Sequence, residues 1–220
     1  MGSITRSFAN NITTSGVLLP ASLTNNSIAN VTSYNPAIAT GNMVLLSSQT
    51  ASSSASISFT TGIDSTYKEY QFYFINLHPS LNQQDLRVNM STDGGSNYNV
   101  TKTSTFFASS HDESGFNDQL TYASGSDSAQ DTGNIPISVI TGNDNDASCS
   151  GSFTLFNPAS TTYVKHFIAN TSIYRTDTVF MNYNSFIGGY GNTTSAINAI
   201  RFKFDTGNID DGTILMYGIK

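Results

Sequence analysis

From residue 43 onward, apolar and polar residues alternate in short runs, which predicts β-strands with one buried and one exposed face. The clearest run spans residues 67–77, where Tyr70, Phe72 and Phe74 would share one face. Shorter runs of the same kind predict further strands at residues 43–46, 55–59, 86–91, 98–107, 120–124, 135–141, 151–156, 162–172, 179–190, 197–204 and 213–219. The pattern contains neither an internal repeat nor an amphipathic helix of useful length.

Two turns are expected to join neighbouring strands as hairpins. The sequence Asp93-Gly94-Gly95 supplies positive φ after the strand at 86–91, with residues 98–107 as the returning partner. A second turn, at residues 205–212, is expected to pair the strand at 197–204 with the last strand. About ten to twelve strands at intervals of roughly 8 to 15 residues predict an all-β fold, namely an antiparallel, jelly-roll-like β-sandwich.

Residues 1–42 differ from the rest of the chain. Their short apolar islands are separated by Asn, Ser, Thr and Gly, and Pro20 and Pro36 interrupt the pattern. Such a segment buries little alone, so we expect an extended N-terminal arm that becomes ordered on docking to a neighbour. The alternative is a loose N-terminus that packs on its own domain, the β-sandwich of residues 43–220. The apolar residues expected to make the assembly contacts are Ile4, Phe8, Ile12, Val17, Leu18, Leu19, Leu23, Ile28 and Val31.

Composition and charge narrow the classes of function. Ser, Thr and Asn make up 82 of the 220 residues and only 11% are charged, which favours strands with hydroxyl and amide groups on their outer faces. A net charge of −6 and nine scattered Lys and Arg residues disfavour binding to nucleic acid or to anionic membranes. No apolar stretch is long enough to insert across a membrane, and the first residues contain no apolar signal core.

No cluster in the sequence predicts a metal site or a cofactor. His111-Asp112-Glu113 is the only close titratable cluster, and a solvated acidic loop is favoured because adjacent strand residues would point to opposite faces. Residues 142–146 and 208–212 resemble oxygen-rich calcium loops. Asn and Asp are also the commonest turn formers, so turns are favoured at both places.

Catalysis is not expected either. Hydrolase motifs are absent, and Glu69 and Glu113 are the only glutamates, so we expect that the protein is not an enzyme. The single cysteine, Cys149, begins a predicted strand and is interpreted as a small buried apolar residue.

Tyrosines offer a candidate for sugar binding, because an aromatic ring can stack on the apolar face of a sugar. Six tyrosines are predicted to lie in or near loops rich in Asn and Asp, although tyrosines of β-proteins more commonly cap the edge of the core. These are Tyr34, Tyr98, Tyr122, Tyr174, Tyr183 and Tyr190. The absence of Trp weakens the sugar interpretation.

A family resemblance is carried by four stretches: SSQTASSSASISFTTGIDSTYKEYQFYFINLHP, STDGGSNYNVTKTSTFF, LFNPASTTYVKHFIANTS and GYGNTTSAINAIRFKFDTGNIDDGTILMYGIK. Over residues 43–220 the chain resembles proteins of tailed bacteriophages of marine and freshwater bacteria, cyanophages and pelagiphages among them. In those phages a similar block occurs alone or at the end of longer fibre-like chains. The start, SITRSFANNITTSG, also resembles the starts of such proteins.

The resemblance implies a virion structural protein that folds in the host cytoplasm and is released by lysis; it carries over no catalytic residue. Its arm would dock on portal, tail, fibre or major capsid subunits while the sandwich faces outward. A fibre or appendage component is favoured, as a homo-oligomer, with a trimer first, whose distal loops touch host glycans. The alternatives are a capsid decoration protein that clamps major capsid subunits and a free carbohydrate-binding module. A third is a glycan-degrading enzyme, for which we expect no activity.

Overall fold

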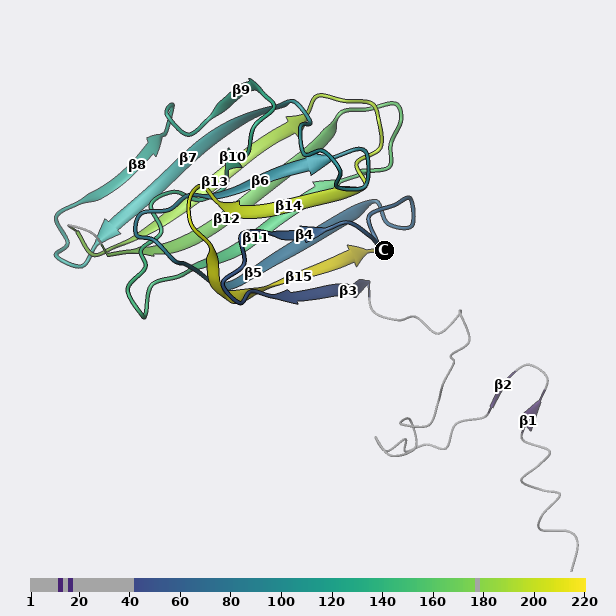
Figure 1. The fold of residues 1–220 in the computed structure, drawn as a ribbon, viewed down its shortest axis with the longest axis horizontal. Helices are drawn as coiled ribbons and strands as arrows, with labels where there is room; N and C mark the ends of the chain where they lie inside the picture. The colour runs from purple at the N-terminus through teal and green to yellow at the C-terminus, as the bar shows by residue number, and fades with distance from the viewer. Residues whose placement is uncertain (1–11, 14–15, 18–41, 177–178) are drawn as a thin grey trace, which may run out of the picture. The chain divides into compact units, whose positions relative to one another are not determined.

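The computed structural model describes residues 12–13, 16–17, 42–176 and 179–220 (Figure 1). The chain divides into two units, residues 1–42 and residues 43–220. In the first unit, strands β1 (Ile12–Thr13) and β2 (Gly16–Val17) pair antiparallel, with Ile12 opposite Val17. The other predicted arm contacts lie outside the described residues: Ile4, Phe8, Leu18, Leu19, Leu23, Ile28 and Val31.

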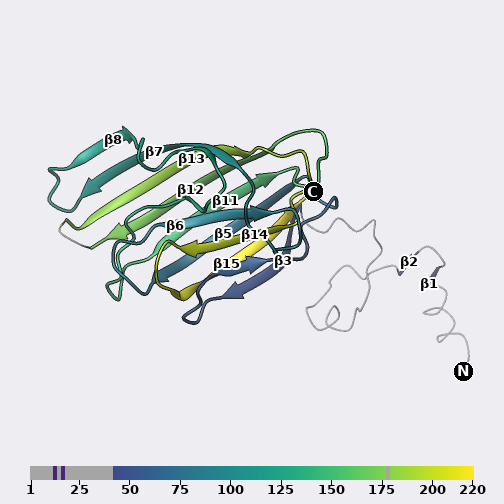
Figure 2. The same cartoon turned by 45° about the horizontal axis from the view of Figure 1, so that its top comes forward.

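The second unit is an antiparallel β-sandwich, as the sequence predicts, and the described residues contain no helix (Figures 1 and 2). The large sheet has the order β3 (Met43–Thr50), β15 (Ile209–Ile219), β5 (Glu69–Pro79), β11 (Cys149–Phe156), β12 (Lys165–Arg175), β13 (Met181–Gly191), β7 (Lys102–Asp112) and β8 (Asp118–Tyr122), and β9 (Ser128–Asp131) also pairs with β7. The small sheet has the order β10 (Ile135–Pro136), β6 (Leu86–Ser91), β14 (Ala199–Phe204) and β4 (Ile57–Phe59). The chain crosses repeatedly between the large and the small sheet, in the manner of a jelly roll.

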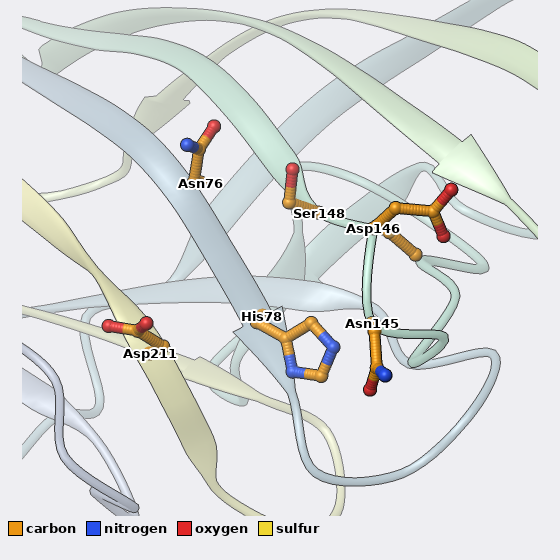
Figure 3. A pocket seen from close by; sticks show the side chains of 7 residues that line it. Asn76, His78, Asn145, Asp146, Ser148 and Asp211 are labelled. Carbon is orange, nitrogen blue, oxygen red and sulfur yellow. The ribbon is translucent and has the colours of Figure 1, made fainter.

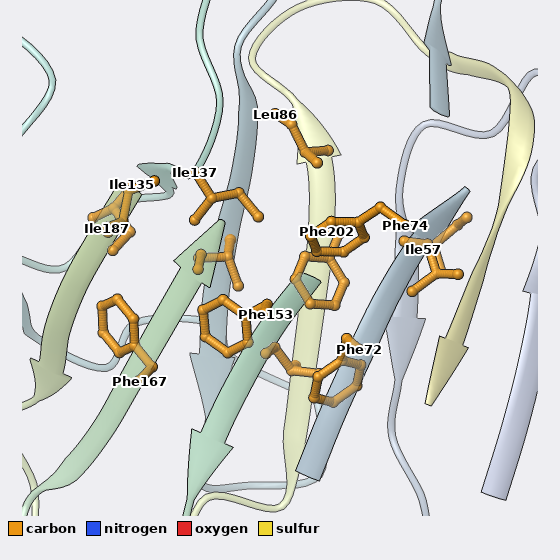
Figure 4. Close-up of a cluster of buried hydrophobic side chains, with 14 of the residues drawn as sticks. Ile57, Phe72, Phe74, Leu86, Ile135, Ile137, Phe153, Phe167, Ile187 and Phe202 are labelled. Atoms are coloured by element: carbon orange, nitrogen blue, oxygen red, sulfur yellow. The ribbon is translucent and has the colours of Figure 1, made fainter. Parts of the chain in front are cut away.

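Phenylalanines from both sheets meet in the middle of the sandwich (Figure 4). The ring of Phe202, on β14, lies 5.0 Å from Phe74, 5.4 Å from Phe72 and 5.8 Å from Phe153. Phe153 in turn stacks on Phe167, with the ring centres 5.3 Å apart. These side chains occupy alternate positions of their strands, so the period-two pattern explains why this face is the buried one.

The first predicted hairpin is wrong. The turn exists, with positive φ at Gly94 and Gly95, but β7 begins at Lys102 and pairs with β13, β8 and β9 in the large sheet. Strand β6 instead pairs with β10 and β14 in the small sheet. The Asp93 carboxylate holds the start of the loop between β6 and β7 together. Its Oδ1 accepts hydrogen bonds from the Ser91 hydroxyl (2.6 Å) and the Asn97 N–H (2.8 Å). These bonds, Ser91 first, lower the pKa of Asp93 to about 2.

The predicted C-terminal hairpin is also wrong. Strand β14 pairs with β4 and β6, whereas β15 lies between β3 and β5 in the other sheet. The turn is shorter than expected because β15 already begins at Ile209. An inward-outward alternation looks the same whichever sheet a strand joins, so it identifies a strand without identifying its partner.

Two lysines are buried on the inner face at one end of the large sheet. Lys102 and Lys165 lie on either side of Gly191, on strands β7 and β12. The Lys102 Nζ donates to Asn89 Oδ1 (2.7 Å), and the Lys165 Nζ donates to the carbonyl oxygen of Tyr163 (2.7 Å). Desolvation lowers the pKa of both amines, that of Lys102 to about 8 even though nearby Asp131 raises it.

Candidate functional site: the outer face of the large sheet

The outer face of the large sheet carries three adjoining hollows. The first, of about 580 Å³, lies where β5 ends beside the loop before β11 (Figure 3). It is lined by Asn76, His78, Asn145, Asp146, Ala147, Ser148 and Asp211. The second, of about 240 Å³, shares Ser148 with the first, and the third, of about 530 Å³, shares Ser150 and Ser172 with the second. They form one shallow depression across β5, β11, β12 and β13, which we call the groove.

The local backbone explains why the sheet is hollowed here. The pairing of β11 with β5 shifts register between Cys149 and Gly151. At Gly151 the neighbouring strand passes so closely that an added Cβ would lie 2.2 Å from the Asn170 carbonyl oxygen. A glycine is therefore required at this point, and Ser150 and Ser152 on either side keep the floor of the groove low.

Hydroxyl and amide groups line the groove, and some of them already make hydrogen bonds within the protein. The Ser150 hydroxyl accepts from the Asn76 N–H (3.0 Å), and the Asn182 amide donates to the Ser172 hydroxyl (2.9 Å). By contrast, the side chains of Ser152, Asn170 and Asn184 have no hydrogen-bond partner within the described part of the chain. Their donors and acceptors remain open to a ligand.

One row of side chains runs from the groove to the edge of the sheet at right angles to the strands. Each member stands opposite the next in the strand pairing, and all point to the outer face. In order from β5 to β8 they are Tyr73, Ser152, Asn170, Phe186, Phe107 and Tyr122, and we call them the aromatic row. The side chains of Phe186, Phe107 and Tyr122 are 43%, 47% and 45% exposed, and the Phe107 and Tyr122 rings meet edge to face at 5.2 Å.

The aromatic row contains no charged side chain, and nor do the second and third hollows. Of the three hollows, only the first has carboxylates in its lining, where Asp146 and Asp211 accompany His78. At the far end of the row, the Tyr122 hydroxyl donates to the Asp127 carboxylate at 2.6 Å. His78 Nε2 lies 3.2 Å from the carbonyl oxygen of Asp144. Among the described residues, no three His, Cys, Asp or Glu side chains are arranged to hold a metal ion. The arrangement is suited to binding an uncharged polar molecule by hydrogen bonds and ring stacking.

The structure places the predicted sugar-contact tyrosines that it describes in loops or close to strand ends, but in different environments. Tyr174 and Tyr190 lie within strands β12 and β13 on the outer face, and Tyr183, also on β13, packs against the core. Tyr98 lies in a loop, but the Arg201 guanidinium covers its ring at 4.3 Å. Tyr122 ends β8 and belongs to the aromatic row. Tyr34 lies outside the described residues.

Sequence reasoning missed the other aromatic members, although a signal for them exists. Consecutive residues of a strand point to opposite faces, so two adjacent large apolar residues cannot both enter the core. The pair Phe106 and Phe107 obeys this rule, since the first is fully buried and the second is exposed. In Phe186 and Ile187 the order is reversed, with the phenylalanine outside. Such doublets identify strands with an apolar outer face.

Cys149 is buried, as predicted, as the first residue of β11. Desolvation raises the pKa of its thiol to about 12, so the reactive thiolate is absent near neutral pH.

The predicted acidic loop at His111-Asp112-Glu113 is wrong for Asp112, which is buried at the end of β7. Burial opposes ionisation there, yet hydrogen bonds from Asn117, Ser114 and the Phe116 N–H outweigh it and lower the pKa of the carboxyl. Glu113 accepts from the Tyr174 hydroxyl instead. The cluster therefore organises the turn between β7 and β8.

The two stretches that resemble calcium loops differ in structure. In the loop at residues 142–146, the carbonyl of Asp144 accepts from the Ala147 N–H at 2.8 Å, which is the predicted turn. The prediction of a turn at residues 208–212 is wrong, because all but the first of these residues belong to β15. The strand is irregular there, with a register shift on either side of Asp211.

Comparison of the chain with protein-family models, with curated proteins and with solved structures finds no match. Within the portion of the chain that the structure describes, no helical segment has the length and hydrophobicity needed to cross a lipid bilayer.

Proposed function

We propose that this protein is a structural component of a bacteriophage virion surface, in a fibre or other appendage, where the sandwich faces outward and contacts host glycans. The observation that carries the proposal is the outer face of the large sheet, where open hydroxyl and amide groups lie beside exposed aromatic rings and the row that joins them is uncharged. A surface of this kind suits repeated contact with saccharides in water. The resemblance of residues 43–220 to phage proteins supports the virion setting.

Residues 1–42 attach the sandwich to the particle in this proposal. The edge of the large sheet also provides a surface on which two copies of the protein could pair. All five residues of the edge strand β8 are exposed, and Leu120 within it is 80% exposed. An exposed edge with apolar side chains is a common site of strand-to-strand association. We therefore expect a homo-oligomer, with a trimer favoured for a fibre component.

Two other functions make different predictions. A capsid decoration protein would bind major capsid subunits through the arm and would need no glycan. A free carbohydrate-binding module would bind saccharide and would be absent from the particle.

The experiment is to locate the protein on purified virions by cryo-electron microscopy or gold-labelled antibody, with a variant that lacks residues 1–42 as the comparison. The proposal expects label on the tail or a fibre, and expects the truncated variant to fold but not to be incorporated. Label on the capsid shell would favour the decoration function. Virions without the protein would overturn the assembly role.

A further inference from the structure

We propose that the aromatic row is the binding site for an extended, uncharged polysaccharide chain that lies across the strands of the large sheet. This inference rests on the proposed function, because it names the ligand class and the face that contacts it. It moves the contact away from the distal loops and onto the middle of the sheet.

Geometry favours an elongated ligand. The row crosses six strands from β5 to β8, so it is about 24 Å long at the usual spacing between strands. Its members follow one another in exact register, and Gly188, next to Phe186 on the floor of the face, meets only the Thr105 hydroxyl, 3.7 Å from where its Cβ would be. The position beside the row on β13 therefore carries no side chain, while Ile168, opposite Gly188 on β12, is 56% exposed and forms an apolar flank of the row.

The order of side chains matches the two kinds of surface that a sugar ring presents. Phe186, Phe107 and Tyr122 offer ring faces and edges for the C–H groups of a pyranose, and Tyr73 offers a fourth ring at the other end. Between these rings, the open groups of Ser152 and Asn170 can bond sugar hydroxyls. Pockets for neutral ligands combine apolar walls with a few polar groups in this way.

Charge argues for an uncharged ligand and against an anionic one. The protein carries a net charge of −6, and the row contains no Lys or Arg to pair with a uronate or a sulfate. Two of the lysines, Lys102 and Lys165, are buried on the opposite face of the same strands. An anionic chain would lose hydration on this surface without gaining an ion pair.

The test measures binding of the full chain by calorimetry and by NMR titration. The probes are four neutral hexasaccharides (maltohexaose, cellohexaose, mannohexaose and chitohexaose), the disaccharide of each, and hexagalacturonate as the anionic counterpart. We expect at least one neutral hexasaccharide to bind at millimolar concentration or better, more tightly than its disaccharide, and hexagalacturonate to bind more weakly. Failure of all four neutral hexasaccharides to bind would overturn the inference.

Variants locate the site. The double variant Phe107→Ala/Phe186→Ala should weaken hexasaccharide binding by about tenfold or more. The matched control is Tyr163→Ala, which removes an exposed tyrosine outside the large sheet and should leave the affinity within about twofold. If the double variant does not fold, Asn170→Ala supplies the same test through a polar member. Equal loss in Tyr163→Ala, or no loss in the row variants, would contradict the proposed site.

A second copy on the same face is the competing occupant, and light scattering separates the two. If the double variant turns an oligomer into a monomer and no glycan binds, the row is an interface between copies and the inference is wrong. Glycan binding by a protein that is absent from virions would overturn the proposed function and leave the row as the site. A protein found on virions that binds none of the neutral hexasaccharides would overturn only the site.

Discussion

The two faces of the large sheet use the same residue types for opposite purposes. The inner face carries Phe72, Phe153 and Phe167, fully buried against the small sheet. The outer face carries Phe107 and Phe186 on strands of the same sheet, each nearly half exposed. The lysines are distributed the other way round, because Lys102 and Lys165 are inside while the aromatic row has no charge.

This contrast teaches that residue type alone does not tell which face of a strand is buried. An apolar side chain that stays exposed in the folded protein changes the free energy of unfolding little, because the unfolded chain exposes it too. A buried lysine is tolerated where carbonyl and amide oxygens accept hydrogen bonds from its ammonium group. The inner face therefore stabilises the fold, and the outer face is available for contact. The following changes test this division.

The largest effect is expected from a truncation in the core. Phe153→Ala should lower the free energy of unfolding by about 3–5 kcal/mol, because it removes a ring that packs on Phe72, Phe167 and Phe202. The outer counterpart Phe186→Ala should cost no more than about 1 kcal/mol. Urea unfolding followed by circular dichroism measures both. Equal losses would show that the outer face also holds the fold together.

The next largest effect is a pH dependence of the free energy of unfolding that comes from the buried Lys102. Below about pH 8, Lys102 is charged in the folded and the unfolded protein alike, so the full cost of burying the ammonium is present. Between about pH 8 and 10.5 the folded protein binds fewer protons than the unfolded chain, so stability rises with pH. Relative to Lys102→Met, the wild-type protein should gain about 2–3 kcal/mol over this window.

Thermal unfolding of both proteins from pH 7 to pH 10.5 measures the difference. Desolvation raises the pKa of Tyr70, Tyr174 and Tyr183 in the folded protein, so their titration lowers stability at high pH. Both proteins contain these tyrosines, so this contribution cancels in the comparison. A constant difference across the window would mean that Lys102 keeps an ordinary pKa.

A pair of glycines tests how tightly the outer face is built. Gly151→Ala should cost about 1–3 kcal/mol, since the new methyl would overlap the backbone of Asn170. Gly188→Ala is the matched control, because a Cβ there meets only the Thr105 hydroxyl at 3.7 Å, and it should change stability by less than about 1 kcal/mol. Chemical denaturation of the two variants gives the comparison directly. Similar values would mean that β11 and β12 can move apart at little cost.

The last prediction, with the smallest expected effect, concerns the reactivity of the buried Cys149 thiol. Cys149 should stay unmodified by a thiol reagent at pH 8 in the folded protein, because burial raises its pKa to about 12. The variant Ser150→Cys places a second thiol one residue further along β11 and on the outer face, where it should react. Counting modified thiols by mass spectrometry distinguishes the faces, and rapid labelling of Cys149 would show that β11 opens readily.

The sequence predicts the strands well and their partners poorly. Alternation at Tyr70, Phe72 and Phe74 is a local property, so β5 could be recognised from its own residues. The partners of β6 and β14 depend on where the chain goes after the turns at 93–95 and 205–208, and the same turn chemistry serves a hairpin or a crossing between sheets. The groove was hidden for a similar reason, because Tyr73, Ser152 and Asn170 come together only through registers between strands distant in the sequence.

The position of β15 has a consequence for how the protein is made. The first strand of the sandwich, β3, has its partner in the last, with Met43 opposite Ile219 and Thr50 opposite Thr213. Until β15 has been synthesised, β3 has no place in the large sheet and β5 has an open edge. Completion of the sandwich must therefore wait for β15, and such late, long-range pairing makes folding slow and leaves intermediates exposed to aggregation.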